Sequence, residues 1–523
     1  MSQGIPPNVL AVRALTPPPP IQDGLSWATA FGNPQDAIAL IASDPFSPFD
    51  EIWVAEGICK PTSTGDRTIS FELVPGVQMY GGFLGGETSR DDRPTPFADT
   101  ILSGDLDNFP ASVTSDSLHV VRIREAGQHW LEGFIIERGA AIPSAGDPIP
   151  GNPDNWGGGL LAYDPIGEAD TEVELRDVTF RNCIAGGGGG LAAGTGVDFV
   201  RLSRCRFDNN VGFARDPDVE VGYFGVGGGA LFWNIGGTRV LRTQGGEGTG
   251  LQNVVEGVYT YHTTFSGNRA TYGGAVCVAN VEENIWLINS LFHRNSAYGG
   301  GALFDYQGSV TVSDPVGWPR VEFCTFASNA ALDSLGPATG LWSGGGAIHT
   351  QWGVGGQPPF PSIVVQSSIL WGNTDQSPAT VAAASIGGGA AVAAQVLSSD
   401  VEVPASSTPP WPGWNANGNI NQDPLFVNAV GGNLRLSFGS PCIDAAEDQV
   451  LDRTPGLGLG DFADVDRNGI FGGTNGQHLP IDLDLTPARE SFYLTVPLPT
   501  LALPNVRADM GCYEYFLGNP GAQ

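Results

Sequence analysis

The chain has 523 residues and a formal net charge of −31. This excess of acid argues against nucleic-acid binding, which requires basic patches, and it disfavours direct contact with polyanions unless cations bridge the two. The 75 glycines and 40 prolines make long helices improbable, and because no run of about 18 apolar residues occurs, no membrane span is expected.

Residues 1–117 are predicted to form an N-terminal cap and the first coils of a repeat. Ala37, Ile38, Leu40 and Ile41 fit one face of a short helix, and a buried strand is expected within 51–61. Residues 1–20 have neither a charged n-region nor an apolar h-region. Either a secretion signal has been removed, or export follows another route, or the protein stays inside the cell; we expect a secreted or cell-surface protein.

From residue 118 to residue 416 the sequence repeats with a period of roughly 20–30 residues. Phe265-x-x-Asn268 can be laid on Phe292-x-x-Asn295, and each pair is followed by a Gly-Gly-Ala segment. Short alternating runs broken by turns indicate strands, and strands that cannot bury a face alone indicate a solenoid. We therefore predict an all-β fold, a right-handed parallel β-helix.

Aligning the repeats produces columns of equivalent residues. The first is apolar, the second is mostly aromatic, and the third is mostly asparagine. They contain Leu175, Leu202, Thr260, Leu287, Val321 and Val365; Phe180, Phe207, Phe265, Phe292, Phe326 and Leu370; and Cys183, Asn210, Asn268, Asn295, Asn329 and Asn373. Stacked asparagines at a turn can hydrogen-bond along the axis, so these columns are expected to be structural.

Residues 417–523 change in character and are predicted to form an irregular C-terminal cap. Two short motifs recur in the coils, Phe-x-x-Asn and Gly-Gly-Ala-[Ile/Leu/Val], and they resemble the repeats of polymorphic outer-membrane proteins. The tail segments DPLFVNAVGGNLRLSFGSPCIDAAED and DMGCYEY, with SWATAF near the start, resemble choice-of-anchor Q surface proteins of the pectin-lyase-like superfamily. The resemblance implies a secreted or surface β-helix.

That superfamily includes polysaccharide lyases and hydrolases, so catalysis was considered. Lys60 is the sole lysine, which leaves no lysine base on the coils. Four arginines close in sequence could serve instead, in a calcium-assisted β-elimination with an arginine or tyrosine base; otherwise they form a solvated cluster. They are Arg176, Arg201, Arg204 and Arg206. No aspartate pair suited to an inverting hydrolase falls on a coil strand.

Long insertions enter successive coils at one place, so they should cluster along one edge. These insertions span 139–156, 211–226 and 331–343, and their aromatic residues include Trp156, Tyr223, Phe224 and Trp342. A second group, predicted to face solvent from the strand after the glycines, contains Phe232, Cys277, Phe304 and His349. Aromatic side chains near acids suit carbohydrate binding; the alternative is that they only pack the loops.

One segment has the spacing of a calcium loop. Asp464, Asp466 and Asn468, followed by Gly469, match the first half of an EF-hand-type loop, although Asn475 stands where glutamate is expected. The alternative is a hydrogen-bonded turn. Among the seven cysteines, Cys442 and Cys512 are the plausible disulfide pair.

Three functions therefore remain open. The first is a non-catalytic secreted or cell-surface β-helix that binds carbohydrate or another surface through clustered loops. The second is a polysaccharide lyase that uses Ca²⁺. The third is a structural subunit of an extracellular assembly, formed by self-association.

Overall fold

The computed structural model describes the greater part of the chain. It covers residues 4–14, 20–109, 112–142, 153–163, 171–212, 226–233, 257–279, 281, 284–307, 319–332, 344–352, 363–376, 385–388, 394–403, 417–443 and 445. The description that follows is confined to these residues.

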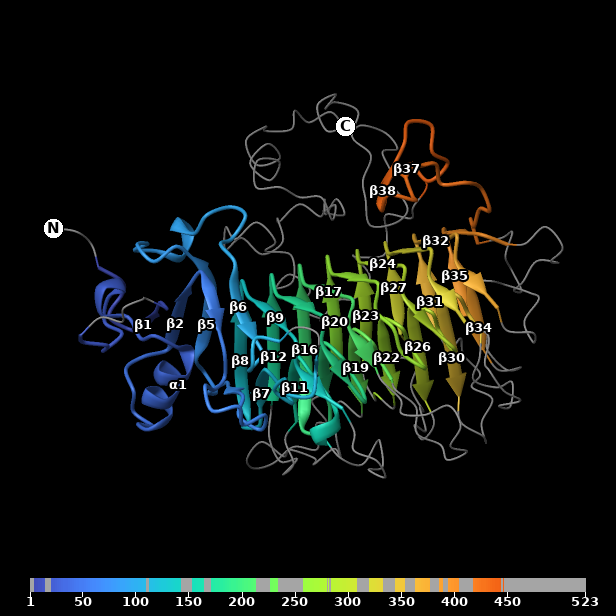
Figure 1. Cartoon of the computed structure of the whole chain (residues 1–523). Coiled ribbons are helices and arrows are strands. Elements are labelled where there is room, and N and C mark those ends of the chain that lie inside the picture. Colours follow the sequence, from blue (N-terminus) through green and yellow to red (C-terminus); the bar gives the residue numbers. More distant parts are fainter. Residues whose placement is uncertain are drawn as a thin grey trace, which may run out of the picture.

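Three long parallel sheets form the body of the molecule (Figure 1). We name them sheet A, with 11 strands, sheet B, with 10, and sheet C, with 9. The chain runs from sheet A to sheet B to sheet C and then back to sheet A, and every strand pairs in parallel with its equivalent one coil away. The predicted all-β parallel β-helix is confirmed.

The strands of sheet A, from one end of the solenoid to the other, are β1 (Val9–Val12), β2 (Glu51–Ala55), β5 (Gln78–Phe83), β8 (Gly127–Glu132), β12 (Thr171–Arg176), β16 (Val197–Ser203), β20 (Gly257–Tyr261), β23 (Asn284–Ile288), β27 (Arg320–Glu322), β31 (Ile363–Gln366) and β35 (Ala394–Leu397). Those of sheet B are β3 (Gly57–Cys59), β6 (Thr100–Ser103), β9 (Ile135–Glu137), β13 (Thr179–Arg181), β17 (Arg206–Asp208), β21 (Thr264–Ser266), β24 (Leu291–His293), β28 (Thr325–Ala327), β32 (Ile369–Trp371) and β36 (Asp400–Val401).

The strands of sheet C are β4 (Phe71–Glu72), β7 (Val121–Ile123), β11 (Leu160–Ala162), β15 (Leu191–Ala193), β19 (Ala230–Trp233), β22 (Val276–Ala279), β26 (Leu303–Gln307), β30 (Ile348–Trp352) and β34 (Ile386–Gly388). Two small sheets lie between sheets B and C along the chain. They consist of β10 (Ala140–Ala141), β14 (Ile184–Ala185) and β18 (Val211–Gly212), and of β25 (Ser296–Ala297), β29 (Ala330–Ala331) and β33 (Thr374–Asp375).

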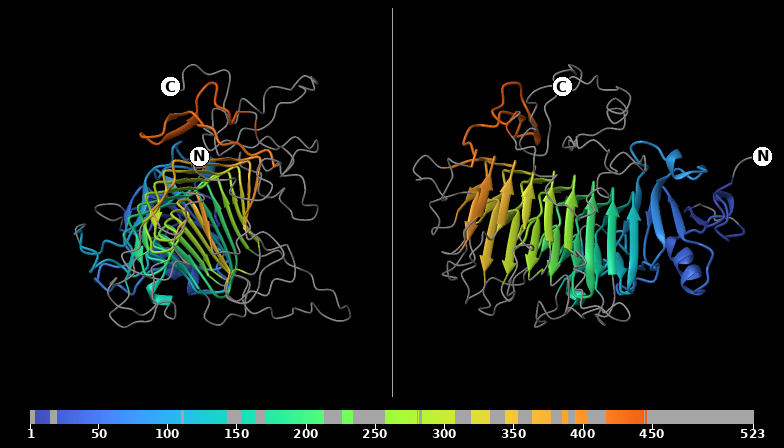
Figure 2. Two further views of the ribbon diagram at one scale, coloured as in Figure 1. Left: turned by 90° about the vertical axis from the view of Figure 1, so that its right-hand side faces the viewer. Right: turned by 180° about the vertical axis from the view of Figure 1, so that it is seen from behind.

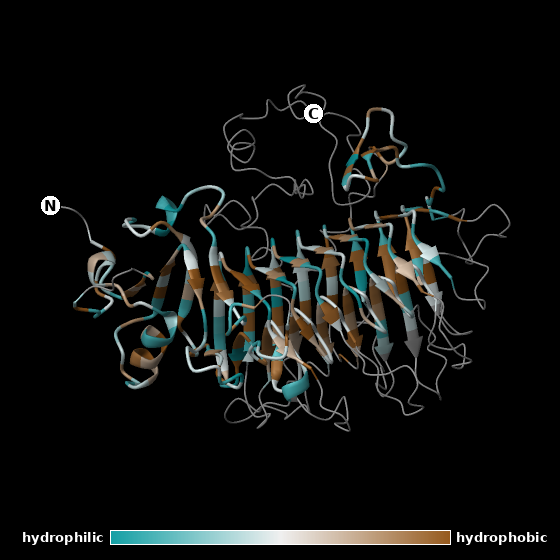
Figure 3. Ribbon diagram, in the orientation of Figure 1, coloured by the Kyte–Doolittle hydropathy of each residue, from teal (hydrophilic) through white to brown (hydrophobic). Residues whose placement is uncertain are grey.

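Equivalent side chains from successive coils fill the interior. Phe207 lies opposite Phe180 and Phe265 in sheet B, and the Phe207 and Phe265 rings stack with their centroids 4.7 Å apart. Leu202 lies opposite Leu175 in sheet A. These residues are fully buried, and polar and apolar segments alternate along the strands (Figure 3). The apolar and phenylalanine columns are therefore confirmed.

The turn after each sheet B strand is built around the asparagine column. At Asn209 the backbone takes φ of 55°, a left-handed conformation that asparagine tolerates, and the next residue, Asn210, points inward. The Asn210 Nδ2 group donates to the Phe180 carbonyl at 3.0 Å and to Asn268 Oδ1 at 3.1 Å. The bonds repeat from coil to coil, so the ladder satisfies buried backbone groups that would otherwise lack partners.

A short helix closes the N-terminal end. Helix α1 (Pro34–Ala42) begins at Asn33, whose side chain accepts a hydrogen bond from the Gln35 N–H. Its buried face contains Ala37, Ile38 and Ile41 as predicted, whereas Leu40, also predicted on that face, is 42% exposed. Three single-turn 3₁₀ helices also occur, at Trp27–Thr29, Arg90–Asp92 and Pro153–Asn155. The helix packs against the first coils and covers the end of the core.

Beyond the last coil an antiparallel hairpin folds back over the solenoid. It consists of β37 (Phe426–Asn428) and β38 (Asn433–Leu436). Figure 2 shows this hairpin outside the stacked coils, near their C-terminal end. Its apolar side chains pack on the outer face of sheet B rather than entering the core.

Candidate functional site

The outer column of sheet C, predicted to face solvent, is covered. Cys277, Phe304 and His349 lie opposite one another on adjacent strands, and the Phe304 and His349 rings stack 5.1 Å apart. The three residues are only 2%, 2% and 1% exposed. The expectation of an exposed aromatic strip is wrong, because Cys277 and Phe304 pack with Trp156 and Tyr272 in a separate hydrophobic cluster.

Phe232 does not belong to this column. It lies opposite Val278 and points into the core, whereas Leu231 lies opposite Cys277. The predicted alignment of the coils that contain Phe232 and Cys277 was wrong by one residue at their glycine pairs. The left-handed glycines Gly227 and Gly273, with φ of 61° and 64°, are the equivalent positions.

The structure brings Trp156 and Phe304 into one cluster and separates both from Phe232. Trp156 is 6% exposed, and its ring lies 4.9 Å from that of Trp233. Tyr223, Phe224 and Trp342 lie outside the described residues, as do the calcium-loop candidates Asp464, Asp466 and Asn468 and the cysteine Cys512.

A different group of functional side chains lies on the outer face of sheet A. Alternation along each strand turns one residue inward and the next outward. We name the resulting outer line of residues, one per strand from β8 to β27, the sheet A row. It contains Trp130, Glu174, Arg201, Tyr259, Trp286 and Arg320.

Guanidinium groups lie over aromatic rings along this row. The Arg176 guanidinium lies 4.8 Å above the Trp130 ring, and that of Arg201 lies 4.9 Å above the ring of Phe199. Both arginines also pair with Glu174, each at 3.3 Å. Two arginines therefore surround one carboxylate on this part of the face.

Exposure divides the sheet A row into two parts. The side chains of Glu174, Arg176 and Arg201 are 19%, 23% and 26% exposed. Tyr259 and Trp286 are buried. A ligand can therefore reach the row between β8 and β16, and again at Arg320 on β27, whose side chain is 44% exposed.

Several N–H groups on this face have no acceptor. Within the described part of the chain, Trp130 Nε1, Trp286 Nε1 and Arg176 Nε are buried atoms without a hydrogen-bond partner. An unpaired buried donor is costly, so these atoms make this face locally unsatisfied. The partly exposed guanidinium groups of Arg176 and Arg201 are suited to a ligand that carries many oxygen acceptors.

Burial also changes the acids on this face. Burial raises the pKa of Glu174 above its ordinary value, an effect that Arg201 and Arg176 oppose. Burial raises the pKa of Glu322 to about 7, although Arg320 pairs with it at 3.4 Å. Glu322 therefore exchanges a proton near neutral pH, which is a property a general acid or base requires.

The four candidate arginines are separated by the fold. Arg176 and Arg201 lie on sheet A, as described above. Arg204 occupies the following turn and makes two bonds to Asp177, of 2.8 and 2.6 Å. Arg206 is on the outer face of sheet B beside Asp208, with 58% of its side chain exposed. Arg176 and Arg201 are the pair that share a surface with aromatic residues.

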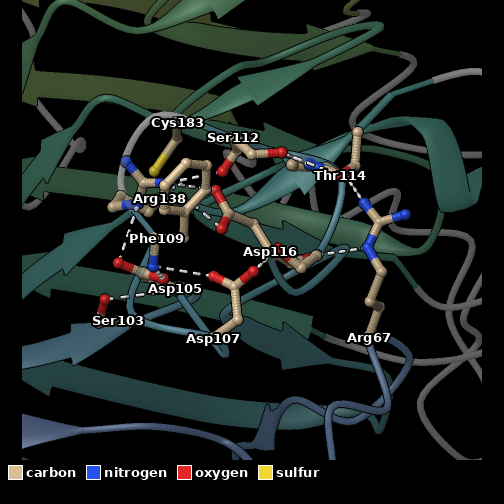
Figure 4. Close-up of polar contacts among 12 residues, drawn as sticks. Arg67, Ser103, Asp105, Asp107, Phe109, Ser112, Thr114, Asp116, Arg138 and Cys183 are labelled. Carbon is tan, nitrogen blue, oxygen red and sulfur yellow. Dashed lines mark hydrogen bonds and ion pairs between the residues drawn. The ribbon is translucent and has the colours of Figure 1, made fainter.

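Three carboxylates converge beside the second coil (Figure 4). One oxygen from each of Asp105, Asp107 and Asp116 lies within 4.8 Å of the others. Arg138 pairs with Asp116 at 3.1 Å and with Asp105 at 3.7 Å. Burial raises the pKa of Asp116 to about 6, with Arg138 opposing the rise.

Carboxylate oxygens are ligands that Ca²⁺ prefers. The Arg138 guanidinium already neutralises part of the charge here, and Asp107 accepts from the Ser115 hydroxyl at 2.6 Å. Hydrogen bonds and ion pairs thus account for the triad without a metal. The loop that carries it was not identified from sequence, because Arg138 joins it from the next coil.

Comparisons with known proteins identify no relative: no family model, curated protein or solved structure matches the chain. Within the described residues, no helix has the length and apolar character needed to span a membrane.

Proposed function

We propose that this protein is a non-catalytic, secreted or cell-surface β-helix of the pectin-lyase-like type, and that it binds carbohydrate. The binding surface is the outer face of sheet A around Trp130, Glu174, Arg176 and Arg201. The aromatic residues of the coil insertions, including Tyr223, Phe224 and Trp342, lie outside the described residues and form a second, separate part of the proposal.

The observation that carries the proposal is the combination of aromatic rings and partly exposed arginines on one face. Sugar rings pack against aromatic side chains, and the guanidinium groups of Arg176 and Arg201 can donate to their hydroxyl groups. Equivalent residues recur at about 4.8 Å along the solenoid. The face therefore repeats on a length scale close to that of a polysaccharide.

The test is a binding screen followed by substitution. The full chain is applied to an array of neutral and acidic glycans, and the strongest soluble ligand is titrated by calorimetry. Trp130→Ala and Arg201→Ala are each expected to weaken binding by about tenfold or more, equivalent to about 1.4 kcal/mol.

Arg206→Ala is the matched control, because it removes an exposed arginine from sheet B. It should leave the affinity unchanged, and all variants should keep the wild-type melting temperature. Equal affinity in wild type, Trp130→Ala and Arg201→Ala would rule out the sheet A face as the binding surface.

One observation favours a polysaccharide lyase as the second candidate. Arg201 lies opposite Tyr259 on adjacent strands; Tyr259 is buried, so the partly exposed Arg201 is the candidate base on this face. The proposed cofactor is Ca²⁺, on the spacing of Asp464, Asp466 and Asn468. Incubation with polygalacturonate and other uronates, with and without Ca²⁺, separates the candidates: ultraviolet absorbance from unsaturated product would establish the lyase and contradict the non-catalytic proposal.

A further inference from the structure

The segment after the last coil is attached to the solenoid over several coils. We name residues 423–443 the C-terminal strap. Leu434 packs with Leu291 and Ala327, and Leu436 and Cys442 pack with Phe323 and Ile369. The strap thus covers the outer face of sheet B across β24, β28 and β32 (Figures 1 and 2).

A buried acid lies where the strap leaves the coils. Asp400 on β36 is 0% exposed. Its Oδ1 accepts from the Gln422 N–H at 3.2 Å, and its Oδ2 accepts from the Cys442 thiol at 3.2 Å. Asp423 and Glu402 are the charged groups that act on it, and both are acids. No basic side chain of the described chain forms an ion pair with Asp400, so nothing compensates a negative charge there.

A buried base lies under the other end of the strap. His293 on β24 is 7% exposed, and its Nε2 has no hydrogen-bond partner in the described structure. A Cβ placed on Gly432 would lie 3.4 Å from its Cε1 atom. The neighbouring Arg294 donates to the Val430 carbonyl and is the charge that acts on the imidazole. The residues opposite His293 on β21 and β28 are Ser266 and Ala327, which are uncharged.

We propose that Asp400 and His293 are a compensating pair that keeps the strap closed across the acidic pH range. Both groups are neutral when the strap is closed, because burial disfavours the charged form of each. One is an acid and the other is a base. When the strap is open, a rise in pH therefore charges Asp400 and discharges His293, and a fall in pH does the reverse. Closure is then far less sensitive to pH than either group alone would make it.

The signs follow from proton linkage. Burial raises the pKa of Asp400 to about 7, above an ordinary carboxyl value of about 3.9, so its contribution to closure is full at low pH and is lost as the pH rises to about 7. Burial lowers the pKa of His293 to about 4, below an ordinary value of about 6.5, so its contribution is full above that value and is lost as the pH falls. Between about pH 4 and 6.5 the two effects oppose each other.

The test measures hydrogen exchange of the β37–β38 amides in the full chain, at pH values of about 4.5, 5.5 and 6.5 and corrected for intrinsic exchange rates. In wild type the equilibrium constant for opening of the strap should change by less than about threefold over this pH range. In Asp400→Asn opening should increase as the pH falls, approaching tenfold per pH unit, which is the limit for one proton. In His293→Gln it should increase by a similar factor as the pH rises.

Peptides from β12 and β16, which lie several coils away from the strap, are the internal reference. The proposal is overturned if wild type has the slope of a whole proton, or if the two variants shift in the same direction or not at all. Should either variant fail to fold, the other variant decides the outcome together with wild type. Its opening must depend on pH in the direction given above, and the absence of that slope would overturn the proposal.

Discussion

Asn268 is a residue whose single side chain serves three consecutive coils. Its Oδ1 accepts from the Asn210 N–H at 2.9 Å, and its Nδ2 donates to the Phe207 carbonyl at 2.7 Å and to Asn295 Oδ1 at 3.0 Å. Alanine would leave these buried groups without partners, at about 1–3 kcal/mol each. We expect Asn268→Ala to lower the free energy of unfolding by about 3–5 kcal/mol, measured by chemical denaturation.

Ser266 provides the control for that experiment. It lies two residues earlier on β21, on the outer face and partly exposed. Ser266→Ala should change the free energy of unfolding by less than about 0.5 kcal/mol. If the two variants are equally stable, the asparagine ladder does not hold the coils together.

At the scale of elements, the glycines before each sheet C strand allow adjacent coils to approach closely. A Cβ at Gly301 would lie 2.1 Å from the Gly346 carbonyl oxygen, and because that atom belongs to the backbone it cannot rotate away. Gly301→Ala is therefore expected to lower the free energy of unfolding by more than about 4 kcal/mol, seen as a loss of the calorimetric transition.

Gly86 differs from Gly301 in having open space around its Cα. Nothing lies within 4 Å of a Cβ placed there, and its φ is not in the left-handed range. Gly86→Ala should keep the wild-type melting temperature or raise it, since alanine restricts the unfolded chain. A marked fall in Gly86→Ala would show that glycine is required in this loop for another reason.

The elements also show what sequence reasoning could and could not recover. The sequence repeat predicted the coils and their inward columns, because buried positions recur with a period that is visible in one amino-acid sequence. It failed at Phe232, where three adjacent glycines, Gly227 to Gly229, made the register ambiguous. The sheet A row was recoverable, since Glu174 and Arg201 immediately precede inward leucines and must therefore point outward.

Other features were beyond the reach of spacing in sequence. Asp105, Asp107 and Asp116 meet only because a loop closes on Arg138 from the next coil. The covering of Phe304 likewise depends on Tyr272, whose ring lies 4.8 Å from that of Phe304. Contacts of this kind depend on loop paths, which have no periodic signal.

At the scale of the whole molecule, each coil contacts only its neighbours, so the number of coils is not fixed by any one interaction. Asn268 and Asn295 are separated by 27 residues and make the same contacts. Excision of residues 265–291 would join Thr264 to Phe292 in the register the coils already use. We expect a cooperative unfolding transition with a melting temperature lowered by about 5 °C or less.

A shorter excision, of residues 265–290, tests whether register is the reason. It leaves one extra residue in the joined strand, and a shift of one residue exchanges the inward and outward faces. That variant should lose several times more stability than the excision of a whole period. Equal melting temperatures for the two would show that the solenoid absorbs the extra residue, and the argument from register would fail.

The parallel pairing of every long sheet also has a mechanical consequence. The hydrogen bonds that join strands connect neighbouring coils, so they run roughly along the solenoid axis, with the slant of parallel pairing. A pulling force along that axis therefore loads one pair of coils at a time, and the molecule should yield by peeling from an end. Each plain coil of 27 residues would release about 90 Å of chain, so stretching a single molecule should give a regular series of small force steps rather than one large rupture.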